Sequence, residues 1–338
     1  MTQRGYVQCL AWTLALAAGA MLLPGCGSGG GAGAPAAKKS GRIRLAGIIF
    51  QEDDFYRLVQ FGMRDAAKAA DVELLEGASG NKLDKEIDLI NTYIARGVDA
   101  ILVPPVSRKG SVAALKQAHD KGITLIVHNT PIDADFAAAH IECSPADLGE
   151  QTGKAARKYI EEKLGGKAKI AILAFKSQLS EQSDARTGGF KKEVMQLPGV
   201  EVVAEQDAWL PELAVSKAGD ILTAHPEVDV IYAANEGGTI GSVLAVKNAG
   251  KTGKVVVFGT DVNEQLLTFL LSPDNILQAI TAQRPVEVGR LAVEYALKAL
   301  RKEPIETPKY LKGILLSRTD PEGVKDYEKQ LKQWMSKG

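Results

Sequence analysis

Cysteine, histidine and tryptophan are scarce in this sequence of 338 residues, which contains 3, 4 and 3 of them. Cys9 and Cys26 fall in an N-terminal segment that we expect to be removed or modified, so Cys143 is left alone and the folded part has no internal disulfide. An excess of either charge is also missing, since 41 basic residues balance 41 acidic ones. A neutral chain has no electrostatic reason to bind nucleic acid, and we expect none as a partner.

Known catalytic motifs are missing as well. Residues 250–254 have the glycine and lysine types of a phosphate-binding P-loop without its spacing, and residues 236–241 lack the first glycine of a dinucleotide fingerprint. No Gly-x-Ser-x-Gly elbow occurs. His140 and Glu142 have the spacing of a zinc deaminase motif, but its Pro-Cys-x-x-Cys partner is absent. We therefore expect a protein that is not an enzyme, with no catalytic residue, no metal and no cofactor.

No run of apolar residues is long enough to cross a membrane. Residues 10–23 are interrupted only by Thr13 and fall short of the roughly 20 residues that a membrane-spanning helix needs. With Arg4 before them, residues 1–25 have the pattern of a signal peptide. They lead into Leu23-Pro24-Gly25-Cys26, which resembles a bacterial lipobox, so we expect cleavage before Cys26 and lipidation of its sulfur. The alternative is an ordinary signal peptide with an incidental cysteine.

Small residues dominate the next stretch. Residues 26–41 are rich in glycine and alanine and have nothing to bury, so they are expected to form the lipidated N-terminus and a flexible tether. A lipid, a spacer and a globular body together predict an extracytoplasmic protein, in the periplasm or at the cell surface, that is anchored to a membrane.

From residue 42 onward, apolar runs of strand length alternate with amphipathic helical patterns. Strands are expected at 43–50, 72–75, 100–103, 124–128, 139–143, 170–175, 200–204, 228–233, 255–259, 276–281 and 311–316. Helices are expected at 55–69, 82–96, 111–121, 146–164, 184–196, 213–224, 264–271, 286–301 and 321–336, with one more closed by Gly250. This alternation predicts an α/β fold of two doubly wound parallel-sheet lobes, which also suits the chain length.

One βαβ unit points to a binding site. Its strands, 228–233 and 255–259, stop at the polar side chains of Asn235 and Asp261. Open α/β folds place ligands where the carboxyl ends of parallel strands meet. Residues 98–103 and 123–129 repeat the pattern and end in Asn129, and the preceding His128 is the only histidine that we place near a site. The sequence therefore predicts a cleft lined by strand ends from two similar halves.

Several short motifs occur in a specific order along the chain. They are Asp53-Asp54-Phe55-Tyr56, Ala185-Arg186-Thr187-Gly188-Gly189-Phe190, Asp207-Ala208-Trp209, Thr223-Ala224-His225-Pro226, Ala234-Asn235-Glu236, Gly259-Thr260-Asp261 and Ala282-Gln283. With them, residues 42–317 resemble the ribose- and galactose/glucose-binding type of periplasmic sugar-binding protein, which has the type I fold and serves ABC transporters.

This resemblance implies a cleft between two lobes that close on a sugar. Phe55 or Tyr56 would sandwich the ring with Trp209. The hydroxyls would bond to Asp53, Asn129, Arg186, Asn235, Asp261 and Gln283. Carboxylate, amide and guanidinium groups suit hydroxyls, and each charge-assisted bond contributes about 1.5–3 kcal/mol. Two acids against one arginine favour a neutral monosaccharide or polyol over a phosphorylated sugar.

The resemblance also implies the domain boundaries and the partners. Lobe 1 would comprise residues 42–143 with 284–310, lobe 2 would comprise 144–283 with 311–320, and 321–338 would form a tail helix. Three crossovers would form a hinge, two of them at 143–145 and 282–284. The protein would act as a monomer and deliver its sugar to the membrane permease of an ABC transporter.

Three alternatives use the same features differently. A sensor that presents sugar to a membrane kinase or chemoreceptor would have the same fold. A lipid-anchored enzyme that modifies sugars would form a product. A sugar-sensing transcriptional repressor is disfavoured, because a signal peptide stands where its DNA-binding helices would be.

Overall fold

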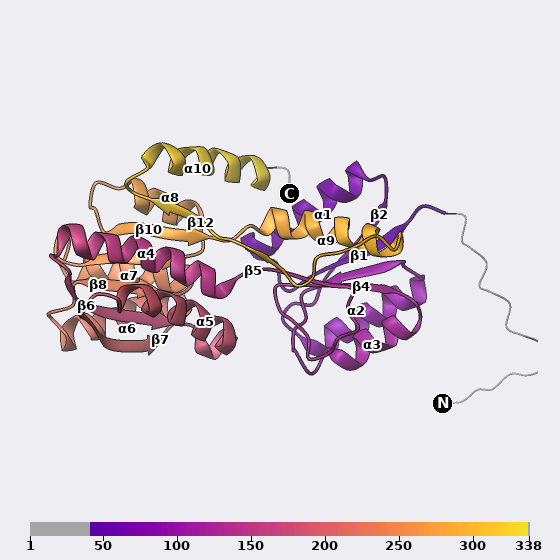
Figure 1. The fold of residues 1–338 in the computed structure, drawn as a ribbon, viewed down its shortest axis with the longest axis horizontal. Helices are drawn as coiled ribbons and strands as arrows, with labels where there is room; N and C mark the ends of the chain where they lie inside the picture. The colour runs from indigo at the N-terminus through magenta and orange to yellow at the C-terminus, as the bar shows by residue number, and fades with distance from the viewer. Residues whose placement is uncertain (1–40, 337–338) are drawn as a thin grey trace, which may run out of the picture. The chain divides into compact units, whose positions relative to one another are not determined.

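Strands and helices alternate along the described chain and form two six-stranded sheets (Figure 1). The computed structural model describes residues 41–336, so the expected signal peptide, most of the tether and Cys26 lie outside the described residues. Within residues 41–336, no helix combines the length and the apolar character that crossing a membrane requires.

The first sheet consists of parallel strands. Its members are β1 (Arg44–Ile49), β2 (Glu73–Ala78), β3 (Ala100–Val103), β4 (Thr124–His128), β5 (Ala139–Cys143) and β11 (Lys309–Leu311). They lie in the order β11-β5-β4-β3-β1-β2, and every neighbouring pair is parallel. The central strand β3 is buried throughout, which explains its continuous apolar sequence.

Helices cover both faces of the first sheet. On one face, α1 (Asp54–Ala69) and α9 (Pro285–Leu300) share an apolar core with the strands. On the other face, α2 (Leu83–Arg96) and α3 (Val112–Asp120) do the same. Helix α1 begins where it does because Asp53 accepts a hydrogen bond from the backbone N–H of Tyr56, a standard N-cap.

The second sheet repeats this arrangement. Its members are β6 (Lys167–Ala174), β7 (Gly199–Asp207), β8 (Val230–Ala233), β9 (Val256–Thr260), β10 (Leu277–Ala282) and β12 (Ile314–Ser317). The order is β12-β10-β9-β8-β6-β7, and only the edge strand β12 runs antiparallel to its neighbour. Both sheets thus have the doubly wound strand order in which the first strand lies between the second and the third.

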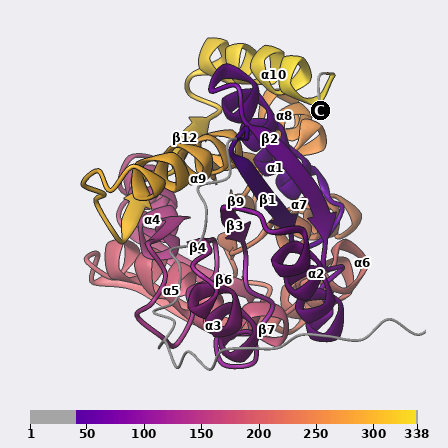
Figure 2. The same cartoon turned by 90° about the vertical axis from the view of Figure 1, so that its right-hand side faces the viewer.

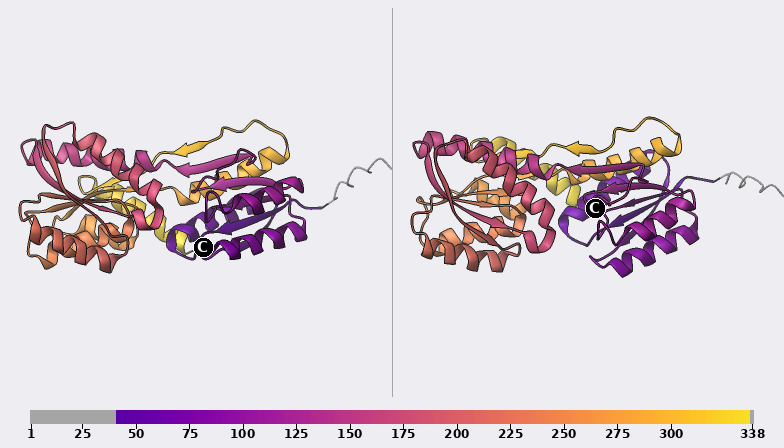
Figure 3. Two further views of the ribbon diagram at one scale, coloured as in Figure 1. Left: turned by 90° about the horizontal axis from the view of Figure 1, so that it is seen from below. Right: turned by 60° about the horizontal axis from the view of Figure 1, so that its bottom comes forward.

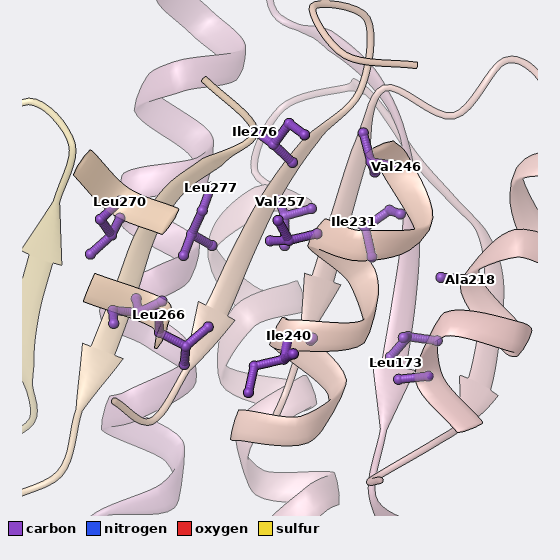
Figure 4. Close-up of a cluster of buried hydrophobic side chains, with 14 of the residues drawn as sticks. Leu173, Ala218, Ile231, Ile240, Val246, Val257, Leu266, Leu270, Ile276 and Leu277 are labelled. Carbon is purple, nitrogen blue, oxygen red and sulfur yellow. The ribbon is translucent and has the colours of Figure 1, made fainter. Parts of the chain in front are cut away.

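The second sheet is also covered on both faces (Figures 2 and 3). Helices α4 (Pro145–Lys163) and α5 (Lys176–Val194) cover one face, and α6 (Pro211–Ala224), α7 (Glu236–Asn248) and α8 (Glu264–Leu271) cover the other. Figure 4 shows the apolar core between the sheet and helices α6, α7 and α8, in which Ile231 and Val257 of the sheet face Ile240 and Leu266 of the helices. A last helix, α10 (Pro321–Met335), contacts α8, β12 and α1.

The chain passes between the two sheets three times, between β5 and α4, between β10 and α9, and between β11 and β12. Hydrogen bonds tie these crossings together. The backbone N–H of Arg284 donates to Cys143 Sγ (3.1 Å), and its side chain donates to the Lys312 carbonyl (2.9 Å). Asp147 accepts from the backbone N–H of Gly313 (2.9 Å). The three crossings therefore form one connected hinge.

The fold class predicted from the sequence is confirmed, with two local corrections. The stretch 311–316 was expected to be one strand, but it is divided between β11 and β12 at the third crossing, because Lys312 and Gly313 carry the chain from one sheet to the other. Helix α5 begins at Lys176, eight residues before the expected residue 184, and Leu179 interrupts it with a non-helical conformation. The helix start predicted at residue 184 therefore lies after this kink.

Helices α4 and α5 approach each other closely at glycines. A Cβ atom on Gly149 would lie 1.9 Å from the backbone oxygen of Arg186, and one on Gly189 would lie 2.3 Å from that of Ala146. Side chains at these positions would push the helices apart. The glycines therefore determine how α5 lies on the sheet, and with it the position of Arg186.

The substitution Gly149→Ala should lower the free energy of unfolding by about 1–3 kcal/mol, because the added methyl group overpacks the α4–α5 contact. Gly188→Ala in α5 is the control, since nothing lies within 4 Å of its added methyl group. It should stabilise the helix by about 0.5–1 kcal/mol. Urea denaturation measures both, and equal effects would contradict the close approach.

Candidate functional site

A pocket of about 560 Å³ lies at the carboxyl ends of strands from both sheets. Its volume is in the range of small-molecule sites, which is roughly 300–1,000 Å³. Eight residues expected at a site line it: Asp53, Phe55, Tyr56, Asn129, Arg186, Asn235, Asp261 and Gln283. They follow β1, β4, β8, β9 and β10 or lie on α1 and α5. The structure thus brings them together, while their role in binding stays a prediction.

The carboxylate of Asp261 is the centre of the polar side of this pocket. Its Oδ2 accepts a hydrogen bond from Arg186 Nη1 (3.0 Å), and its Oδ1 accepts one from Gln283 Nε2 (2.7 Å). The backbone N–H of Glu236 also donates to Oδ2 (3.3 Å). Asp261 has a φ of 73°, a left-handed conformation that aspartate tolerates better than most residues. This turn ends β9 and directs the carboxylate into the pocket.

Among residues 41–336, Arg186 is the only basic side chain that lines the pocket, and it is 4% exposed. Its Nη1 also donates to the Ala234 carbonyl (2.9 Å), and its guanidinium carbon lies 5.0 Å from the centre of the Phe175 ring. Within residues 41–336, its buried Nε has no hydrogen-bond acceptor. The guanidinium is therefore held from two sides by the second sheet.

Two of the predicted ligand residues also begin helices. Asn235 accepts from the backbone N–H of Gly238 (3.1 Å) and donates to the Trp209 carbonyl (2.9 Å). Asp53 caps α1 and accepts a second hydrogen bond from Gln51 Nε2 (2.5 Å). Each residue satisfies the start of a helix with one oxygen, so the local fold fixes where its polar group lies at the pocket.

Aromatic side chains form another part of the lining. The ring of Tyr56 stacks on that of Phe50, with centres 5.6 Å apart, and meets the edge of Phe55 at 5.0 Å. Phe175 lines the pocket from the second sheet. Burial raises the pKa of Tyr56, so its hydroxyl stays protonated. Aromatic faces therefore come from both sheets.

Two predicted site residues, Trp209 and His128, lie outside this lining. Trp209 is half-buried and packs against the core beneath α4 and α5, and its carbonyl accepts a hydrogen bond from Asn235. His128 is fully buried, and burial lowers its pKa to about 4. Its Nδ1 lies 2.7 Å from Asn129 Oδ1, so this neutral ring supports Asn129 from behind. Asn129 ends β4 with a φ of 62°, as Asp261 ends β9.

Sequence reasoning missed several lining residues. Phe175 follows β6 in the way that Asn235 follows β8, but its apolar side chain gave no signal of a site. Gln178 and Gln182 lie on the unexpected first part of α5. Leu331 and Met335 come from the C-terminal helix. Glu236 could have been found, because it directly follows Asn235.

Acidic groups dominate the charge of the pocket. In the part of the chain that the structure describes, five carboxyl groups line it against the single Arg186: Asp53, Asp54, Glu236, Asp261 and Glu264. Burial, followed by the charge of Asp261, raises the pKa of Glu236 to about 7, although Asn263 donates a hydrogen bond to it (2.9 Å). No three His, Cys, Asp or Glu side chains of residues 41–336 are arranged to hold a metal ion. The arrangement suits a ligand that is rich in hydroxyl groups and lacks negative charge.

A family model described as a periplasmic binding protein domain matches residues 48–304. This match runs from β1 to just beyond α9 and includes every residue predicted to bind the ligand.

Related proteins include solute-binding proteins. One is a periplasmic-binding protein of an ABC transporter from Escherichia coli, 28% identical over 77% of this chain and 81% of its own length. Another is a xylitol-binding protein from Mycolicibacterium smegmatis, 29% identical over 75% of this chain and 70% of its own.

Solved structures with the same fold contain bound sugars or polyols. A solute-binding protein from Actinobacillus succinogenes with D-allose has a TM-score of 0.75 and 26% identity, and covers 83% of this chain and 100% of its own. One from Bacillus halodurans with myo-inositol has a TM-score of 0.74 and 25% identity, and covers 86% and 98%.

The raised pKa of Glu236 predicts a pH-dependent stability. Above pH 4.5, the unfolded chain ionises this carboxyl freely, whereas the folded protein resists ionisation until about pH 7. Glu236 therefore costs stability that grows from pH 4.5 to pH 7 and then levels off. Glu236→Gln should remove this cost, so its stability relative to the unmodified protein should be higher at pH 8 than at pH 5. Urea denaturation at the two pH values tests this, and a difference that does not change with pH would refute it.

Proposed function

The chain belongs to the periplasmic binding protein family, and from that premise we propose that it captures a neutral monosaccharide or polyol for an ABC transporter. The observation that carries this proposal is the group of Asp261, Arg186 and Gln283 at the strand ends, with aromatic rings in the same pocket. Periplasmic binding proteins are not catalysts, so the pocket binds its ligand without changing it.

The chemistry of the pocket fits a sugar or polyol. Hydroxyl groups both donate and accept, so they can donate to Asp261 and accept from Arg186 or Gln283. Each hydrogen bond to a charged partner contributes about 1.5–3 kcal/mol. The C–H face of a sugar ring is apolar and suits the rings of Phe55, Tyr56 or Phe175. A phosphate would face five carboxyl groups and one arginine, which disfavours phosphorylated sugars.

Binding involves closure of two lobes about the hinge. Lobe 1 comprises residues 42–143 with 284–310, and lobe 2 comprises 144–283 with 311–320. Two contacts between these parts support closure as the mechanism. Gln182 Nε2 donates to the Asn129 carbonyl (3.4 Å), and Arg108 pairs with Glu181. The side chains of Arg108 and Glu181 are both exposed, so their ion pair contributes little to stability. It can therefore separate when the lobes open.

The N-terminal segment supports a membrane anchor. Signal peptide cleavage before Cys26 would leave a lipidated cysteine and a glycine-rich tether ahead of the folded body. The protein would then bind its ligand outside the cytoplasm and remain close to the membrane permease that receives it. A tethered receptor need not diffuse away from its transporter.

The ligand class is tested with a thermal-shift panel of D-allose, myo-inositol, xylitol and glucose 6-phosphate. A ligand that binds only the folded protein raises its melting temperature, so at least one neutral compound should do so and the phosphorylated sugar should not. Asp261→Asn replaces the carboxylate with a neutral amide of the same size, and asparagine also tolerates a positive φ. It should weaken binding by about tenfold to a hundredfold.

Asp207→Asn is the matched control for titration calorimetry, because Asp207 ends β7 of the same sheet and does not line the pocket. Its affinity should be unchanged. If Asp261→Asn also binds as tightly as the unmodified protein, the pocket has been assigned wrongly.

Anchoring is tested separately with Cys26→Ser. Without the cysteine sulfur no lipid can be attached, so the protein should move from the membrane to the soluble fraction or remain unprocessed. Membrane fractionation and mass spectrometry of the mature N-terminus measure this. Unchanged membrane association, with no lipid on the N-terminus of the unmodified protein, would rule the anchor out.

A further inference from the structure

The C-terminal helix α10 contacts elements that belong to each of the two sheets or pack on it. It lies against α8 and β12 of the second sheet and reaches α1 on the first (Figures 1 and 2). Asp320 caps its start by accepting from the backbone N–H of Gly323 (3.1 Å). Its outer face carries exposed ion pairs, such as that between Lys332 and Glu328 (2.6 Å). The helix is therefore amphipathic, with its apolar face turned towards the protein.

The apolar face of α10 is firmly attached to the second sheet. Val324, Tyr327 and Leu331 are buried in the core that also contains residues of α8 and β10. The ring of Trp334 meets that of Tyr327 edge-on, with centres 6.3 Å apart. The same core includes Leu58 of α1, so apolar packing continues from α10 onto the first sheet's helix.

The last turns of α10 reach the pocket. Leu331 and Met335 line it together with three further apolar side chains, those of Leu58, Val262 and Pro285. None of these five side chains offers a hydrogen bond. Asp261, Arg186 and Gln283 supply the polar side. The lining of the pocket therefore combines apolar side chains, two of them from α10, with polar groups at the strand ends.

We propose that α10 is a wall of the ligand site and that Leu331 and Met335 select the ligand's apolar side. The inference rests on the proposed function, since it assumes that a sugar or polyol occupies this pocket. A ligand hydroxyl turned towards Leu331 and Met335 would lose its hydrogen bonds to water and gain none. The site thus favours a ligand that turns its C–H groups, or a deoxy or alkyl end, towards α10 and its hydroxyls towards Asp261.

The wall also strengthens the polar contacts. Apolar side chains from α10 and α1 exclude water from one flank of the pocket, and hydrogen bonds to Asp261 are stronger where the local dielectric constant is low. Because α10 is anchored on the second sheet, its end at Met335 packs against the core that also contains Leu58 of α1. The wall therefore contains side chains from helices on both sheets.

The test compares two tryptophan substitutions in the same turn of α10. Met335→Trp places a larger side chain in the pocket and should weaken binding of D-allose, myo-inositol or xylitol at least tenfold in titration calorimetry. Lys332→Trp adds the same side chain on the exposed outer face and should leave affinity unchanged. Measuring the melting temperature of each variant checks that it is folded. Equal affinities for the two variants would overturn the proposal.

A second measurement needs no ligand. Leu58 and Met335 line the same two pockets, so Leu58→Ala and Met335→Ala should be non-additive in urea denaturation, whereas Leu58→Ala and Lys332→Ala should be additive. Additivity in both pairs would overturn the α10–α1 wall. If the first pair is coupled and none of the three compounds binds the unmodified protein, the wall stands and the proposed ligand class fails.

Discussion

The ion pair between Asp261 and Arg186 connects the structural elements that form the pocket. Its carboxylate comes from the end of β9 and its guanidinium from α5, and Gln283, which binds the same carboxylate, begins the crossing from β10 to α9. The pair therefore joins the strand ends, a helix and the hinge. Arg186 is almost fully buried, so the pair is screened little by water, and loss of either partner would leave an uncompensated charge. The same groups that hold the second sheet's edge together face the pocket.

The two halves of the molecule each end a central strand with a polar residue that lines the pocket. Asn129 ends β4 and Asp261 ends β9, each with a positive φ, and each contributes a polar side chain to the pocket. Parallel strands bring their carboxyl ends to one edge, so two such sheets facing a common pocket present polar groups from both sides. The three crossings connect the two edges.

Much of this arrangement could be predicted from the sequence, because buried parallel strands read as continuous apolar runs. Strands β4 and β5 have the predicted bounds. The stretch 311–316 could not be divided correctly, because Lys312 and Gly313 interrupt an apolar run only briefly and the change of sheet is a tertiary feature. The polar lining could be predicted from the sequence because its residues follow strands. Phe175 was not, since a buried aromatic residue after a strand resembles core, and Leu331 and Met335 lie on a helix whose place could not be known before the fold. Trp209 follows a strand too, but it packs against the core and is not part of the lining.

The most direct measurement is a crystal structure of the protein with the panel compound that raises its melting temperature most. The account predicts one ligand between the two sheets, with at least one hydroxyl in hydrogen-bonding distance of the Asp261 carboxylate and another near Arg186 or Gln283. It also predicts a ring or C–H face against Phe55, Tyr56 or Phe175. A ligand bound elsewhere, or bound in the pocket with no hydroxyl near Asp261, would contradict it.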